Sequence, residues 1–314
     1  MSQVLNQAKG SNGLSVQRVC VRAGMSRQNY YAARGHRQRR EIDEALVLGL
    51  VKRERRQQPR LGARKLLSVL APELAGAGVI MGRDRLFELL RDRGLLVERK
   101  RGRPKTTQSR HCLPVFHNRV AELKEQAPNE VWVSDLTYVR TEEGFVYAAV
   151  IMDRFSRKLV GAHMGDSLEA EGCIQALDRA LAELPSGCFP IHHSDRGCQY
   201  CCHDYVERLL DRGLGVSMTE QNHCYENAHA ERVIGILKDE YDLDATFRTK
   251  AQAVRSFDQA VYLYNHRRPH MGLGYRVPAQ EHEREGGRRR RPPRGAAAAA
   301  SRGARPGRRT SPNF

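Results

Sequence analysis

The chain has 314 residues, of which 40% are hydrophobic, so it is long enough for two or three domains and at least one buried core. Its formal net charge of +17 favours a polyanionic partner, most often nucleic acid, although a merely basic protein of the ribosomal type has a similar charge. No apolar run reaches the roughly 18 residues of a membrane span, and the N-terminus lacks a signal-peptide pattern. We therefore expect a cytoplasmic protein with reduced cysteines, nucleoid-associated when bound to DNA and with no membrane partner.

The first segment, 1–57, is predicted to be helical and helix-turn-helix-like. Val16, Val19 and Cys20 mark one face of a first helix, a turn follows at 23–25, and Ser26 is a plausible cap of the next helix. An ordinary helical hairpin has the same pattern. A separate charged helix is expected over 41–57.

A second helix-turn-helix is predicted over 58–97, with helices at 62–74 and 83–93. Apolar positions give each helix a buried side: Leu66, Leu67 and Leu70, then Leu86, Phe87, Leu89 and Leu90. Basic residues on the other side are expected to contact DNA: Arg64, Lys65, Arg83 and Arg85. A basic linker, 98–128, follows, which either tracks phosphates or is a solvated tether.

The segment 129–282 changes to a strand-like pattern. Strands are predicted over 131–139, 145–153 and 157–165 as an antiparallel meander, then near 189–194 and over 214–218. Helices are predicted over 168–184 with Ser167 as cap, near 202–212, around Glu231, and over 249–265 with Thr249 as cap. The order predicts an α/β fold, a mixed sheet flanked by helices on both faces. The tail 283–314 is rich in Arg, Gly and Ala and is expected to be disordered.

Three acidic residues, Asp135, Asp195 and Glu231, lie on separate predicted elements. Asp135 alternates with apolar residues in a strand, where a carboxylate is costly unless it is paired or bound to metal. Asp195 follows a strand end, where binding sites gather in open sheets. Carboxylates suit Mg²⁺ or Mn²⁺, and two such ions roughly 3.5–4 Å apart clamp both reacting oxygens of a phosphoryl transfer. We interpret the three acidic residues as catalytic residues and as ligands of one metal site. The alternative is that they are scattered surface charges.

Lys238 is predicted to share a helix face with Glu231 and to hold a DNA phosphate. The alternative is a surface lysine paired with Asp239 or Glu240. A zinc site is a further alternative use of side chains near Asp195, and the residues concerned are His192, His193, Cys198, Cys201, Cys202 and His203. Cys198 and Cys201 form a CxxC, but no second ligand pair follows at a comparable spacing, so ordinary thiols are favoured.

Four stretches carry a resemblance to a known family: WVSDLTYVRTEEGFVYAAVIMDRFSRKLVGAHM, HHSDRGCQY, SMTEQNHCYENAHAERVIGILKDEY and YNHRRPHMGLGYRVP. They resemble the integrase-core signatures of insertion-sequence transposases, and above all the second-reading-frame (OrfB) proteins of the IS-three family. The resemblance covers about 14–280, and 60–97 is similar to that family's helix-turn-helix. It departs at Glu226, where the family often has Asp, and in the Arg/Ala tail.

The resemblance implies a ribonuclease-H-like fold and a DDE triad at Asp135, Asp195 and Glu231 with a divalent metal, and Lys238 as the base that contacts DNA. It implies metal-dependent strand cleavage and strand transfer at insertion-sequence ends. It also implies a homo-oligomer in a synaptic complex and an upstream-frame (OrfA-type) partner. Two alternatives stay open: a catalytically silent DNA-binding regulator, and a ribonuclease-H-like nuclease without strand transfer.

Overall fold

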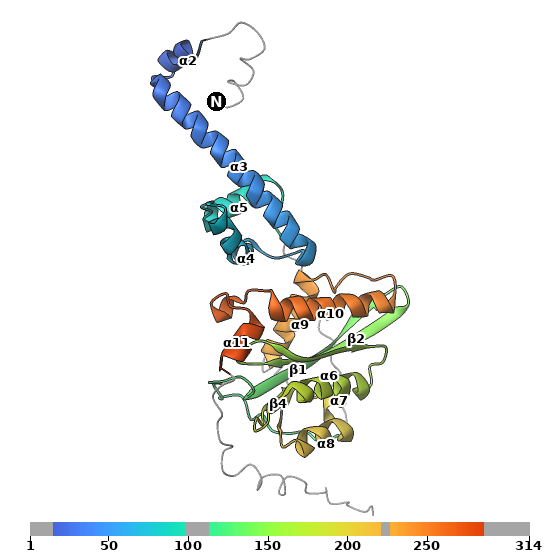
Figure 1. Ribbon diagram of the computed structural model, residues 1–314. Helices are drawn as coiled ribbons and strands as arrows, with labels where there is room; N and C mark the ends of the chain where they lie inside the picture. Colours follow the sequence, from blue (N-terminus) through green and yellow to red (C-terminus); the bar gives the residue numbers. More distant parts are fainter. Residues whose placement is uncertain (1–14, 98–112, 221–226, 286–314) are drawn as a thin grey trace, which may run out of the picture. The chain divides into compact units, whose positions relative to one another are not determined.

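The computed structural model describes residues 15–97, 113–220 and 227–285 (Figure 1). The chain divides into two compact units, 1–57 with 69–96, and 58–68 with 97–314. The basic stretch 98–111, Glu226 and most of the predicted disordered tail lie outside the described residues. The domain boundaries drawn from the sequence stay predictions.

The N-terminal helices are α2 (Val16–Arg22) and α3 (Arg27–Gln57). The Ser26 hydroxyl accepts a hydrogen bond from the backbone nitrogen of Asn29 at 3.1 Å, as expected of a cap. The prediction of a separate helix from 41 was wrong, because α3 runs unbroken through 31 residues. Gly35 is the only helix breaker between the two predicted helices, and a single glycine costs a helix only about 1 kcal/mol.

The next two helices, α4 (Ala63–Gly76) and α5 (Arg83–Asp92), match the predicted ranges closely. Leu86, Leu89 and Leu90 are buried as predicted, but Phe87 is 46% exposed, so its assignment to the buried side was wrong. The three leucines at i, i+3 and i+4 already form the apolar stripe of α5, and Phe87 lies to one side of it.

The sheet of the second unit has five strands in the order β3-β2-β1-β4-β5. β1 pairs antiparallel with β2, and β2 with β3, whereas β4 pairs parallel with both β1 and β5. The predicted meander and mixed sheet are therefore confirmed, and the arrangement is ribonuclease-H-like. The strand bounds are β1 Val131–Thr141, β2 Gly144–Asp153, β3 Leu159–Gly165, β4 Ile191–Ser194 and β5 Gly215–Met218.

Helices cover both faces of this sheet, as predicted (Figure 1). One apolar layer joins Trp132 of β1 to α6 (Ala170–Glu183), α7 (Cys198–Cys201) and α8 (His203–Asp211). The other joins Val131, Val133 and Val139 of β1 to α9 (Ala228–Glu240) and α10 (Lys250–His266). The period-two alternation read from the sequence therefore assigns these side chains to the correct faces.

The predicted caps have different outcomes. Thr249 caps α10, and its hydroxyl accepts from the backbone nitrogen of Gln252 at 3.1 Å. Ser167 does not cap α6, which begins at Ala170 with Glu169 as its cap residue. The Ser167 hydroxyl instead accepts from the backbone nitrogen of Glu169 at 3.1 Å, so it organises the turn before the helix.

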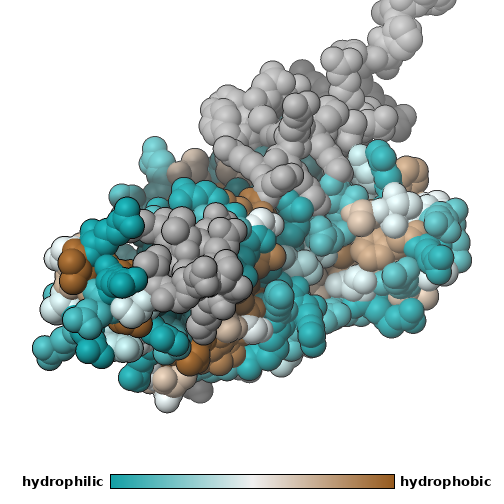
Figure 2. Space-filling model, turned by 90° about the horizontal axis from the view of Figure 1, so that it is seen from above, coloured by the Kyte–Doolittle hydropathy of each residue, from teal (hydrophilic) through white to brown (hydrophobic). Residues whose placement is uncertain are grey.

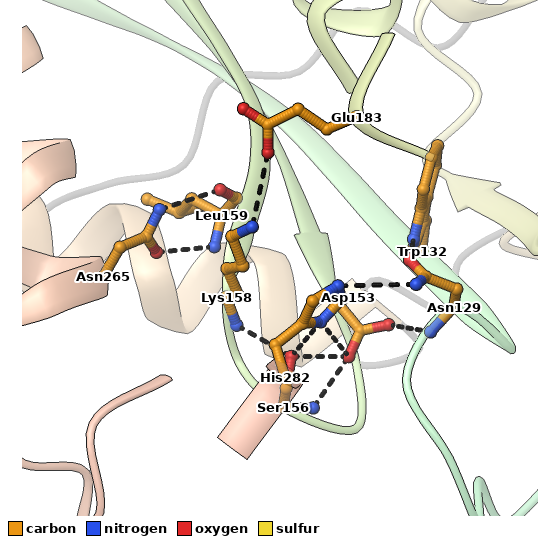
Figure 3. A network of polar contacts seen from close by, with 9 residues as sticks. All are labelled: Asn129, Trp132, Asp153, Ser156, Lys158, Leu159, Glu183, Asn265 and His282. Atoms are coloured by element: carbon orange, nitrogen blue, oxygen red, sulfur yellow. Dashed lines mark hydrogen bonds and ion pairs between the residues drawn. The ribbon is translucent and has the colours of Figure 1, made fainter. Parts of the chain in front are cut away.

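The chain continues through a short 3-10 helix, η2 (Met271–Leu273), into α11 (Pro278–Glu285). Residues 283–285 are thus helical, which corrects the start of the predicted disordered tail. Figure 3 shows how α11 meets the turn between β2 and β3: the His282 ring lies 2.9 Å from the Ser156 hydroxyl and 3.4 Å from the Asn129 amide. The fully buried Asp153 carboxylate accepts from the backbone nitrogens of Asn129 and Ser156, both at 2.7 Å.

On the face seen in Figure 2, hydrophobic residues form separate patches among hydrophilic ones. Among the described residues, no helix combines the length and the apolar composition that crossing a membrane requires.

Candidate active site

The site lies where β4 ends beside the middle of β1. β4 pairs with β1 only over Val131–Val133, so it does not cover the edge of β1 beyond that point. Asp135 lies on β1 just past this pairing, and Asp195 directly follows the last residue of β4. Glu231 lies in the first turn of α9, the helix packed on β1. The three elements therefore bring the predicted acids to one end of the sheet.

The electrostatics of Asp135 report on its neighbours. Its pKa is raised to about 7, first by burial and then by the negative charges of Asp195 and Glu231. A hydrogen bond from the Leu136 backbone nitrogen, at 2.8 Å, and the charge of Lys238 act in the opposite direction. Because such charge effects decline with distance, Asp135 has both other acids and Lys238 as neighbours.

The turn after β4 positions Asp195. The backbone nitrogen of Gly197 donates to Asp195 Oδ1 at 2.9 Å. A Cβ at Gly197 would lie 3.0 Å from the same oxygen and 3.1 Å from Gln199 Oε1. A glycine therefore lets the backbone approach the carboxylate closely, which fixes its direction at the strand end.

Lys238 lies on α9 with its ammonium 4.9 Å from the centre of the Tyr138 ring. The alternative pairing with Glu240 has competitors, because Glu240 accepts from Lys65 at 2.5 Å and from Arg268 at 2.7 and 2.8 Å. Lys238 is also close enough to Asp135 to lower its pKa. Its ammonium thus faces the acids and the end of the β1–β2 hairpin.

The other predicted DNA contacts differ in what surrounds them. Arg64 is exposed, whereas Lys65 is held by Glu240 in a largely buried ion pair. Arg83 pairs with the exposed Asp84 at 2.7 Å, and Arg85 lies 3.7 Å from Glu44. DNA contact by these four stays a prediction, with Arg64 and Arg83 the more accessible of them.

The cysteine and histidine side chains near Asp195 have other partners. His192 Nε2 lies 2.9 Å from the Tyr205 hydroxyl, and burial lowers the pKa of His192 to about 3. His193 Nδ1 lies 2.9 Å from the Ser217 hydroxyl. Within the residues that the structure describes, no three His, Cys, Asp or Glu side chains are grouped closely enough to hold one metal ion. This applies both to the residues of the zinc alternative and to the three acids, whose side chains are not arranged around one ion in this structure.

Family models match the catalytic part of the chain. Two models, each described as "Integrase core domain", match residues 125–224 and 212–278. Together they span the sheet, α9, α10 and all three acids.

Relatives extend the match beyond that part. The "Insertion element IS600 uncharacterized 31 kDa protein" of Shigella sonnei is 37% identical over 85% of this chain and 98% of its own length. The "Transposase for insertion sequence element IS904" of Lactococcus lactis subsp. lactis (strain IL1403) is 33% identical over 70% of this chain and 86% of its own. "Transposase InsF for insertion sequence IS3A" of Escherichia coli (strain K12) is 34% identical over 58% of this chain and 62% of its own.

Among solved structures, the HTLV-2 integrase catalytic core domain in complex with magnesium matches with 18% identity and a TM-score of 0.42. The match covers 51% of this chain and 99% of that one.

Proposed function

Since the chain belongs to the IS-three family of insertion-sequence transposases, and is thus a DDE transposase and a polynucleotidyl transferase, we propose that Asp135, Asp195 and Glu231 are its catalytic acids. They would act in DNA strand cleavage and strand transfer at the ends of the element. Neither the matched models nor the relatives favour a silent regulator or a nuclease without strand transfer.

The observation that carries the assignment of the acids is the raised pKa of Asp135. Burial and two neighbouring carboxylates make its ionised form unfavourable in the free protein. A divalent cation would remove that cost, because it offsets the repulsion between Asp135 and Asp195 and replaces lost hydration. Carboxylates with perturbed pKa values at a strand end are typical of catalytic sites.

We propose Mg²⁺ or Mn²⁺ as the cation, with two ions in the reacting complex. The donors fit, since hard cations prefer carboxylate oxygens. Mg²⁺ also uses only one or two carboxylates and completes its shell with water and substrate phosphate. Asp135 and Asp195 would therefore suffice to hold one ion, and Glu231 would contribute once the substrate is bound. When bound, the ions would supply charge stabilisation at the phosphorus and a lowered pKa for the attacking water.

The chain's own residues would orient the DNA. Lys238 would hold a phosphate next to the acids, as a compact point charge on a flexible stem. Water first attacks a phosphodiester at the element end, which breaks the bond to the flanking DNA and leaves a 3′-hydroxyl. That hydroxyl then attacks a target phosphodiester, so that one bond forms as another breaks. The pKa of about 7 belongs to Asp135 in the metal-free protein, so with the ions bound its carboxylate would be ionised and the proton of the attacking group would pass to water.

The partners follow from this chemistry. DNA is both substrate and target, and the net charge of +17 favours its binding. Joining two element ends requires more than one catalytic subunit, so we propose a homo-oligomeric synaptic complex. An upstream-frame (OrfA-type) protein is a second proposed partner, and the location would be the cytoplasm, on the nucleoid.

The test uses the full chain and linear DNA that carries the ends of the element encoding it. With Mg²⁺, the wild type should cleave these ends, and it should join a pre-cut 3′-hydroxyl end to a target plasmid. Asp195→Asn should lower both rates by about 100-fold or more, the order seen when one charge-stabilising group is removed. Asp204→Asn is the matched control, because that side chain is 80% exposed on α8.

Equal activity of Asp195→Asn and the wild type would overturn the assignment of the acids. Cleavage without joining would leave a nuclease. Binding without either reaction, in wild type and variant alike, would leave a regulator.

A further inference from the structure

Two aromatic side chains stand exposed at the end of the β1–β2 hairpin. Tyr138 is 40% and Phe145 is 48% exposed. Their rings meet edge to face, with centroids 5.5 Å apart and an interplanar angle of 88°. They lie on the same side of the sheet, because Tyr138 is paired with Tyr147 and Phe145 with Arg140 in the strand register. Apart from this mutual edge contact, a large part of both rings faces solvent.

The aromatic pair lies further along the strand that carries Asp135 and on the opposite face of the sheet, since residues three apart on a strand point to opposite faces. Tyr138 follows Asp135 on the same strand by three residues, which is a rise of about 10 Å along β1. The ammonium of Lys238 lies 4.9 Å from the centre of the Tyr138 ring. Lys238 comes from α9, which packs on the Asp135 face, and its ammonium reaches the Tyr138 ring where β4 does not cover the edge of β1.

The pair has cationic neighbours, and the hairpin turn next to it carries the exposed Glu142 and Glu143. Arg140 is exposed on the same side of β1 and lies opposite Phe145 in the register. Proteins bind unpaired nucleotides with aromatic faces beside cationic side chains. The base of every nucleotide can stack on an aromatic ring, and its phosphate is attracted to the cation. A subunit contact would also be enriched in aromatic and Arg side chains but depleted in Lys, and here the Lys238 ammonium lies over the Tyr138 ring.

We propose that Tyr138 and Phe145 form a stacking platform for an unpaired base of the DNA strand whose phosphate Lys238 holds. The proposal rests on the proposed function, because it places the platform beside the reacting phosphate. It adds a ligand subsite: a base unstacked from the duplex end would lie on the aromatic pair, and this would hold the end open for attack. Unstacking a base costs a few kcal/mol, and stacking on aromatic side chains offsets a comparable amount.

The test measures binding without divalent cations, so that it does not depend on the acids. The probe is a hairpin duplex with 2-aminopurine in a short 3′ overhang, and the reference is the same hairpin with a blunt end. Stacking quenches the fluorescence of 2-aminopurine. Wild type should quench it, while Tyr138→Ala and Phe145→Ala should each bind the overhang about tenfold more weakly and lose the quenching. Binding of the blunt hairpin should be unchanged.

Three further variants separate stacking from charge and from folding. Tyr138→Phe keeps the ring and should behave as the wild type. Tyr262→Ala removes a ring that is 62% exposed on α10, away from the hairpin, and should also behave as the wild type. Lys238→Gln should reduce the slope of log affinity against log salt by about one, whereas Tyr138→Ala should leave the slope unchanged.

If Tyr138→Ala quenches the 2-aminopurine fluorescence as strongly as the wild type does, the platform is overturned. Equal weakening on overhang and blunt hairpins, which would indicate a structural role, would overturn it too. A change in self-association without a change in DNA binding would make the pair a subunit contact and also overturn the proposal. Failure of the proposed function gives a different result, full cleavage by Asp195→Asn, which this binding assay does not measure.

Discussion

The side chain of Asn227 joins the helix of Glu231 to the strand of Asp135, because its amide nitrogen donates to the carbonyl oxygen of Ser134 at 2.9 Å. Asn227 occupies the cap position of α9 but makes no side-chain cap bond, and it is only 3% exposed. The amide therefore ties two acid-bearing elements together in place of capping the helix.

Replacing Asn227 with alanine should loosen this tie. The Ser134 carbonyl would lose its buried donor, at a cost of about 1–3 kcal/mol. Since Glu231 would be held less firmly, more Mg²⁺ should be needed for half-maximal cleavage, and kcat should fall more than KM rises. Thr249→Ala is the control, because it removes the α10 cap at a cost of about 1 kcal/mol without touching β1. An unchanged Mg²⁺ requirement in Asn227→Ala would make the contact purely structural.

Asp135 should give the protein a pH dependence without metal. Its folded pKa of about 7 lies above the ordinary aspartate value of 3.8. Between these values the folded state keeps a proton that the unfolded state has lost, so the free energy of unfolding should fall as pH rises from about 4 to 7. Asp135→Asn should lack this contribution. Urea unfolding of both proteins in EDTA across that range measures the difference, and parallel curves would contradict the raised pKa.

Metal binding should compete with that same proton. Mg²⁺ should bind more weakly below pH 7 than above it, and binding near pH 6.5 should release a proton from Asp135. Calorimetry in two buffers of different ionisation enthalpy measures the number of protons released. Release should disappear in Asp135→Asn. If the wild type releases none, Asp135 is not a ligand in the free protein.

Close packing between β3 and α6 should make Gly161 intolerant of any side chain. A Cβ there would lie 2.2 Å from the Ala176 carbonyl oxygen and 3.0 Å from the Ala180 Cβ. Gly161→Ala should therefore lower the free energy of unfolding by about 1–3 kcal/mol or more, because helix and strand must separate. Gly235→Ala is the opposite case, since a Cβ meets nothing within 4 Å inside α9. It should raise stability by about 0.5–1 kcal/mol in the same urea titration.

The stability of the protein should be sensitive to loss of the charge on the Glu240 carboxylate. Arg268, whose side chain is 3% exposed, donates two hydrogen bonds to it, and Lys65 donates another. Glu240→Gln would leave the buried guanidinium without its countercharge, which typically costs about 3–5 kcal/mol. Thermal unfolding of Glu240→Gln beside Asp239→Asn, an exposed neighbour, measures the difference. Similar melting of the two would show that water reaches Arg268.

Local patterns predict those parts of the fold that depend on neighbours in sequence. Period-two alternation gives the strands and their faces, and Thr249 marks a helix start, because both signals are local. The helix boundary predicted at 41 was wrong, because the sequence has no breaker strong enough to end α3 there. Ser167 failed as a cap because its hydroxyl is used in the turn that precedes the helix, and α6 begins only at Ala170.

The candidate site shows the same difference between signals that are local in sequence and contacts that join separate elements. Asp135 stands out because an acid interrupts an apolar alternation, and Lys238 because helical spacing relates it to Glu231. The contacts of Asn227 with Ser134 and of Tyr138 with Phe145 depend on pairing across elements, which spacing along one element cannot give. The pairing of Lys65 with Glu240 was missed for that reason, and contact of Lys65 with DNA stays a prediction.

A polar clamp fastens the last described helix to the β2–β3 turn, because the His282 ring meets both Ser156 and Asn129 above the buried Asp153. Trimming the protein back to just after Glu285 would keep this clamp. Trimming it to before Pro278 would strip away the imidazole and open Asp153 to solvent. We therefore expect that a stably folded fragment containing the sheet must extend past α10 to the end of α11.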